Sequence, residues 1–148
     1  MLAATLAVAA PAHGEEQTRE TYKAQVEPLC QANRVANKRI MAGANDRVKA
    51  GKLGVAGKQF MRVSRSFGGF VTRIATVPPP PADSHRVERW IELMRLLQAR
   101  LNTVGKYFKA GEKIKATHES ILAERSGISA NNISIVFHFH YCRFSHFN

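Results

Sequence analysis

The sequence lacks any complete pattern of the kind that identifies an enzyme. Residues 118–122 (HESIL) begin like the helix of a zinc protease, but Leu122 stands where the second histidine ligand is required. The glycine-rich residues 51–58 resemble a phosphate-binding loop, but the first and last glycines are one residue too far apart and Gln59 replaces the hydroxyl side chain. No nucleophile, acid or base has a recognisable partner, so we expect neither enzymatic activity nor a cofactor.

Long apolar runs are also few. Residues 2–10 are apolar and lead into Ala10-Pro11-Ala12, which matches the core and the cleavage site of a signal peptide, although no Lys or Arg precedes them. No later stretch approaches the ~20 apolar residues of a membrane span. We expect residues 1–12 to be removed and residues 13–148 to be secreted or held in the cell envelope without a transmembrane segment. The alternative is an apolar N-terminus on a cytosolic protein.

Cysteine is scarce, with two residues in the whole chain, Cys30 and Cys142. An even number of cysteines in an exported protein is typical of disulfide bonding, because the oxidising compartments outside the cytoplasm preserve such bonds. We expect a disulfide that joins the first helix to the C-terminal tail.

Apolar residues recur at alternating spacings of three and four in the middle of the chain, which is typical of amphipathic helices. One stripe consists of Phe60, Val63, Phe67, Phe70, Ile74 and Val77. The next consists of Val87, Trp90, Met94, Leu97, Leu101, Val104 and Phe108. Between these stripes lies a proline-rich linker, residues 78–82, after which Asp83 is suited to cap a helix.

Two weaker stripes flank the middle of the chain. The first contains Leu29, Asn33, Ala36, Ile40, Ala44 and Val48. The last contains Ile114, His118, Ile121, Arg125, Ile128, Asn132, Ile135, Phe139 and Cys142. Residues 133–142 also alternate with the period of a strand, but a single strand would leave its backbone groups unpaired. We therefore expect a helix as far as about Phe139 and a tail beyond it.

These stripes predict a single all-α domain with two helical hairpins, residues 18–77 and residues 83–148. Short turns favour an up-down-up-down four-helix bundle, which we expect to be monomeric. The first helix then starts at the end of the bundle where the last helix finishes, so the two cysteines can meet. Asparagines at 33 and 37 are expected to meet those at 131 and 132 in a buried polar layer.

The positive charge is concentrated in residues 28–82, which hold ten basic residues and one acidic residue, a net +9 of the total +11. Six basic side chains at helical spacings are candidates for an anion-binding face: Arg34, Lys38, Lys58, Arg62, Arg65 and Arg73. Outside the cell such a face attracts anionic cell-wall polymers or acidic lipid headgroups. No nucleic-acid-binding motif is present, so specific recognition of nucleic acid is not expected. The alternative is a solvated face that keeps the protein soluble.

A histidine-rich C-terminus suggests a second function, metal binding. His138, His140 and His146 surround Cys142, and imidazole and thiolate are ligands of zinc and copper. A disulfide at Cys142 would remove the thiolate, so we expect no metal site.

Several local motifs together resemble a group of small exported actinobacterial proteins of uncharacterised function. They are Thr-x-x-Thr-Tyr at 18–22, Pro-x-Cys-x-x-Asn at 28–33, a Lys-Ala-Gly-Lys turn, a polyproline-Asp junction and the closing Phe-His-Tyr-Cys-Arg-Phe at 139–144. The resemblance implies an exported helical fold with paired cysteines and implies no activity.

Overall fold

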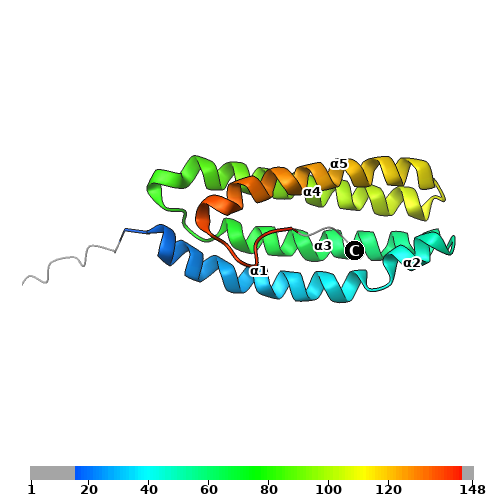
Figure 1. Cartoon of the computed structure of the whole chain (residues 1–148), viewed down its shortest axis with the longest axis horizontal. Helices are drawn as coiled ribbons and strands as arrows, with labels where there is room; N and C mark the ends of the chain where they lie inside the picture. Colours follow the sequence, from blue (N-terminus) through cyan, green and yellow to red (C-terminus); the bar gives the residue numbers. More distant parts are fainter. Residues whose placement is uncertain (1–15, 145–148) are drawn as a thin grey trace, which may run out of the picture.

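The computed structural model describes residues 16–144, which form helices and irregular connections without a strand. The helices are α1 (Arg19–Met41), α2 (Ala44–Lys49), α3 (Leu53–Ala75), the short 3-10 helix η1 (Pro81–Asp83), α4 (Ser84–Lys109), α5 (Lys113–Ser134) and the short 3-10 helix η2 (Ile135–Phe137). The four long helices alternate in direction along one axis (Figure 1). The predicted all-α, up-down-up-down four-helix bundle is therefore confirmed. The predicted signal peptide, residues 1–12, lies outside the described residues.

The core of the bundle lies between α3 and α4. All seven apolar residues of the predicted α4 stripe are buried, and so are the first five of the α3 stripe. The other two long helices pack on the outside of this pair, α1 on α3 and α5 on α4. Contacts between α1 and α5 are few, so helix packing alone does not close the fourth side of the bundle.

The buried face of α5 is not the predicted one. The isoleucines of the predicted stripe are all exposed: Ile114, Ile121, Ile128 and Ile135. Small side chains face the core instead: Ala116, Ala123, Ser126, Gly127, Ala130 and Ser134. Small side chains allow α5 to lie close to α4, because helix separation depends on the side chains at the contact. The isoleucines, seven residues apart, consequently form a line along the outside of the helix.

The last helix also ends earlier than predicted. It stops at Ser134 rather than near Phe139, and His138 adopts a left-handed backbone conformation (φ 51°) that reverses the chain. The reason is burial of aromatic rings. On a continued helix Phe137 and Phe139 would point about 200° apart, whereas after the reversal both rings are buried. Residues 138–144, here called the tail, are neither helix nor strand.

The predicted first helix is interrupted at Gly43, which adopts a left-handed conformation (φ 68°) and separates α1 from α2. The side chain of Gln59 on α3 stabilises the break, because its amide nitrogen donates to the carbonyl oxygens of Ile40 and Ala42 at 2.9 and 3.1 Å. The glycines at 51 and 111 lie in turns with positive φ just past the ends of α2 and α4, where glycine is the favoured residue.

Helices α3 and α4 approach each other most closely where two glycines meet. A Cβ atom at Gly57 would lie 2.6 Å from the carbonyl oxygen of Gly105 and 2.6 Å from the backbone nitrogen of Lys109. Both obstacles are backbone atoms, so neither can move aside without displacing a helix. Glycine is therefore required here by the contact between the two helices.

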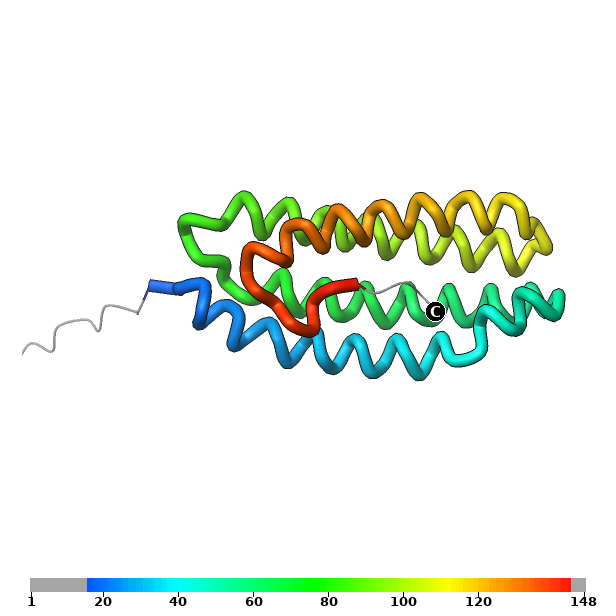
Figure 2. Tube along the Cα trace, in the orientation of Figure 1, coloured from blue at the N-terminus to red at the C-terminus, as the bar shows by residue number. Residues whose placement is uncertain are grey.

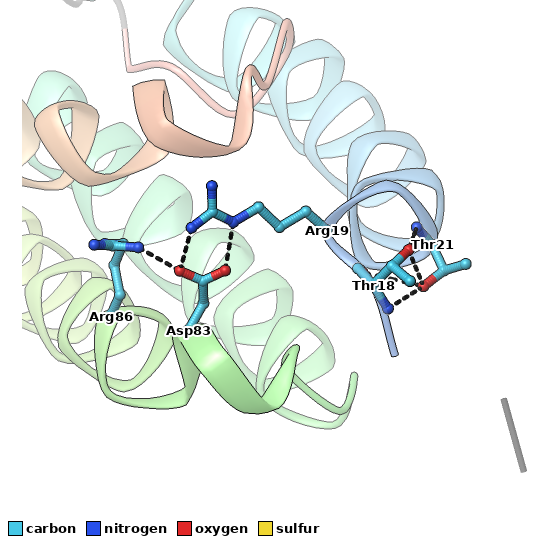
Figure 3. A network of polar contacts seen from close by, with 5 residues as sticks. All are labelled: Thr18, Arg19, Thr21, Asp83 and Arg86. Carbon is cyan, nitrogen blue, oxygen red and sulfur yellow. Dashed lines mark hydrogen bonds and ion pairs between the residues drawn. The ribbon is translucent and has the colours of Figure 1, made fainter. Parts of the chain in front are cut away.

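At the end of the bundle where α1 begins, ion pairs of Asp83 connect α1 to α4 (Figure 3). Its carboxylate is 1% exposed and accepts hydrogen bonds from Arg19 Nε at 2.5 Å and Nη2 at 2.8 Å, and from Arg86. The hydrogen bond from Arg19 is the main reason that the pKa of Asp83 lies below its usual value. Asp83 occupies the predicted N-cap position of α4, but its side chain forms these ion pairs and caps no backbone N–H.

The glycine contact predicts opposite outcomes for two substitutions in α3. Gly57→Ala should lower the free energy of unfolding by about 1 to 3 kcal/mol, the usual cost of an overpacked core. Gly69→Ala should raise it by about 0.5 to 1 kcal/mol, because its Cβ atom meets nothing within 4 Å and alanine favours helix. Urea unfolding measures both values, and a neutral Gly57→Ala variant would contradict the close approach of the helices.

The ion pairs of Asp83 predict a dependence of stability on pH. Asp83→Asn should cost about 1 to 2 kcal/mol at neutral pH, less than a fully buried pair because both arginines are about half exposed. Since folding lowers the pKa of Asp83, its stabilisation is present above the ordinary pKa of about 4 and is lost as pH falls through the folded-state value.

Urea unfolding at a series of acidic pH values checks this prediction. The wild-type protein should lose more stability on acidification than Asp83→Asn. Glu92→Gln is the control, because Glu92 pairs with Arg89 in an exposed position and should contribute little. Equal acid dependence of the wild type and Asp83→Asn would contradict a lowered pKa at Asp83.

Candidate functional site

The tail lies between α1 and α5, on the side of the bundle where these helices do not pack together (Figure 2). The predicted disulfide between Cys30 and Cys142 joins it to α1, with 4.9 Å between the Cα atoms. The carboxylate of Glu27, also on α1, accepts hydrogen bonds from the backbone N–H groups of His140 and Tyr141, the latter at 2.9 Å. The tail is thus held to α1 by one covalent bond and two hydrogen bonds.

The other edge of the tail is held to α5 by Asn131. Its side-chain nitrogen donates to the carbonyl oxygen of Phe144 at 2.8 Å, and its side-chain oxygen accepts from the N–H of Phe144 at 2.7 Å. Phe139 of the tail is buried and stacks on Trp90 of α4 with 5.3 Å between ring centroids. The tail therefore fills the gap between α1 and α5 as far as Phe144.

A groove continues along the gap beyond Phe144. One part, here called the basic compartment, has a volume of about 780 Å³ and is lined mainly by α1, α2 and the tail. The second part, here called the apolar compartment, has a volume of about 410 Å³ and is lined mainly by α4 and α5. The two compartments share four lining residues: Asn45, Leu97, Leu101 and Phe144. The two compartments therefore adjoin at these residues.

Two of the six predicted anion-binding residues, Arg34 and Lys38, line the basic compartment together with Lys49 and Arg143. Asp46 is the one carboxylate in this lining. Among the described residues, none of the four basic side chains has a carboxylate within ion-pair distance. The basic compartment therefore carries a positive potential that the protein does not neutralise.

The other four predicted residues lie elsewhere, on the exposed face of α3. Lys58, Arg62, Arg65 and Arg73 are all exposed, and their positions on the helix are opposite the buried stripe. We call these four residues the α3 basic face. The six candidates thus occupy two surfaces, one concave and one convex.

The predicted layer of asparagines is wrong. Asn33 is 7% exposed, as expected for a core-facing position, but its side-chain oxygen has no hydrogen-bond partner among the described residues, nor has that of Asn37. Asn131 binds the backbone of Phe144, and Asn132 is exposed. The tail separates α1 from α5, so asparagines of the two helices do not form the expected pairs.

The predicted metal ligands do not come together within the described residues. Cys142 has no thiolate because it is bonded to Cys30. His138 and His140 are exposed, and His146 lies outside residues 16–144. Over residues 16–144, no cluster of three or more His, Cys, Asp or Glu side chains has the arrangement of a metal site.

Sequence reasoning missed the groove because its lining comes from every long helix and the tail. The signals that were present are the small residues of α5, among them Gly127, and the asparagine at position 33 in an otherwise apolar stripe. Small side chains leave space, and a buried amide needs a partner.

The structure of the tail predicts how the protein responds to reduction. The disulfide links residues 112 apart, and closing a loop of this size contributes up to about 4.7 kcal/mol in the chain-entropy model. Reduction should lower the melting temperature measured by circular dichroism without removing the helical signal at low temperature, because most of the large buried side chains lie on α3 and α4, which contain no cysteine.

The Cys30→Ser/Cys142→Ser variant should melt like the reduced wild-type protein. Alkylation of denatured, unreduced wild-type protein should label no thiol. Labelling of two thiols would show that the disulfide does not form.

Comparison with known proteins gives no relative for this chain. No family model matches it, and no characterised protein or solved structure matches it significantly. Within the part of the chain that the structure describes, no helix combines the length and the apolar character needed to cross a membrane.

Proposed function

We propose that this chain is an exported, non-enzymatic protein of the cell envelope that binds anionic polymers through the α3 basic face. The observation that carries the proposal is the charge of α3. Its 23 residues include four exposed cations on the face opposite the core and no acidic residue. A solvated helical face that serves only solubility usually mixes charges of both signs.

The dimensions of this face suit a linear partner. Lys58 and Arg73 are 15 positions apart, which corresponds to about 22 Å along a helix. Among the described residues, none of the four cations is paired with a carboxylate. A row of unpaired cations on a convex surface binds an extended polyanion through its field, without requiring a pocket that fits one repeating unit.

Two further observations support an exported, non-enzymatic role. The disulfide between Cys30 and Cys142 is of the kind that persists in oxidising compartments, and the apolar residues 2–10 are typical of a signal peptide. The sequence patterns nearest to catalytic motifs, at residues 51–58 and 118–122, each lack an essential residue.

Reversal of two charges tests the proposal. Arg62→Glu/Arg65→Glu should weaken retention on immobilised polyphosphate, a linear polyanion, by roughly ten-fold at low salt. Stability should change little, because exposed charges contribute little to folding. Retention of the wild-type protein should fall steeply as salt is added. The wild-type protein should also co-sediment with cell walls more strongly than Arg62→Glu/Arg65→Glu.

The matched control is Arg95→Glu/Lys106→Glu on α4, which changes the net charge by the same amount at exposed positions outside the α3 basic face. It should retain most of the binding. Equal losses in the two variants would show that only net charge matters, and retention that ignores both the substitutions and salt would overturn the proposal.

A further inference from the structure

We propose that the groove between α1 and α5 binds a long-chain fatty acid, with the carboxylate in the basic compartment and the acyl chain in the apolar compartment. This site is separate from the α3 basic face and does not depend on polymer binding. The two compartments meet at Phe144, and one is lined mainly by apolar side chains whereas the other is lined by four basic ones.

The apolar compartment offers surface for a hydrocarbon chain. Its floor and walls include Val48, Phe60, Val104, Phe108, Ile121 and Ile128. The volume of about 410 Å³ lies in the range of small-molecule sites. From Leu97 to Phe108 the floor follows α4 for about 16 Å, so it suits an extended chain better than a compact ligand.

The polar side chains of the apolar compartment already have partners, and these side chains include Glu124 and Asn45. Thr117 and Ser120 donate their hydroxyl hydrogens to carbonyl oxygens of their own helix, at 3.0 and 2.8 Å. Both polar atoms of the Asn131 side chain bind the backbone of Phe144. A ligand in this compartment therefore gains chiefly by burial of apolar area, at about 25 cal/mol per Å².

The basic compartment has the opposite character. Arg34, Lys38, Lys49 and Arg143 contribute four positive charges against the single carboxylate of Asp46. The buried side-chain oxygens of Asn33 and Asn37, which also line this compartment, lack a partner among the described residues. Each of these amides also carries two N–H donors, which can donate to a carboxylate in the compartment.

A single anion beside the shared residues would therefore neutralise unpaired cations and accept hydrogen bonds from the N–H groups of Asn33 or Asn37, while its chain extends into the apolar compartment. An ion without a chain would leave the apolar compartment exposed to water. A neutral hydrocarbon would leave the basic compartment unneutralised. A fatty acid satisfies both compartments at once.

Binding of cis-parinaric acid, a fluorescent long-chain fatty acid, to the full oxidised chain tests the proposal. We expect saturable fluorescence enhancement, competition by oleate, and no competition by butyrate, which lacks the chain. The methyl ester of the probe should bind at least roughly ten-fold more weakly, because it has no charge to pair with the cations. Absence of saturable binding, or equal binding of the acid and the ester, would overturn the proposal.

The exposed isoleucines of α5 and η2 supply a matched pair of variants for the acyl chain. Ile121→Gln/Ile128→Gln changes the groove wall and should weaken binding by about ten-fold. Ile114→Gln/Ile135→Gln changes the same line of residues outside the groove and should leave the affinity unchanged. All four side chains are exposed, so both variants should fold, and a thermal melt verifies this. Equal affinity of the two variants for the probe would show that the acyl chain does not lie in the apolar compartment.

A second pair of variants tests the carboxylate. Arg34→Gln/Lys38→Gln should lower the affinity for the probe acid by about ten-fold and should hardly change the affinity for its methyl ester. Arg39→Gln/Arg95→Gln removes the same charge outside both the groove and the α3 basic face and should have less than about a two-fold effect. Arg62→Glu/Arg65→Glu should keep its affinity for the probe, so failure of polymer binding and failure of fatty-acid binding are distinguishable. A different outcome would assign the groove to a second copy of the protein. In that case a dimer would form without ligand, would exclude the probe and would be dissociated by Ile121→Gln/Ile128→Gln.

Discussion

The covalent bond between Cys30 and Cys142 fixes the one part of the bundle that helix packing leaves open. Helices α3 and α4 hold each other through a continuous apolar core, and α1 and α5 each pack on one member of that pair. The separation between α1 and α5 depends instead on the tail, which is bonded to α1 at Cys142 and Glu27 and to α5 at Asn131. The tail therefore sets the distance between α1 and α5, and with it the width of the groove that continues beyond Phe144.

The composition of α5 explains why such a gap exists. Its inward positions are occupied by alanine, serine and glycine, so the helix lies near α4 but has no side chain long enough to reach α1. Its large isoleucines point outward, and two of them, Ile121 and Ile128, become a wall of the groove. An apolar face that would be costly on an ordinary surface thus partly lines the groove.

The sequence was sufficient to predict the helical class, the topology, the disulfide and the cores of α3 and α4. It was insufficient for α5, because Ile114 to Ile135 and the small residues beginning at Ala116 both follow helical spacing, and pattern alone favours the larger apolar side chains. Which face is buried depends on how closely α4 approaches. The groove was beyond reach for a related reason, since Asn33, Leu97 and Phe144 are distant in sequence and meet only after the chain reverses at His138.

The length of chain between the two cysteines has a consequence for biosynthesis. Cys30 belongs to the first helix, and its partner lies in the last seven residues of the chain, 112 positions later. A nascent chain that has emerged only as far as α4 can form the core between α3 and α4, but it has no second thiol with which to close the bond. The bond can therefore form only after α5 and Cys142 have been synthesised, and any oxidant that acts earlier meets a single unpaired Cys30. The tail is thus locked onto α1 only after all four long helices are available.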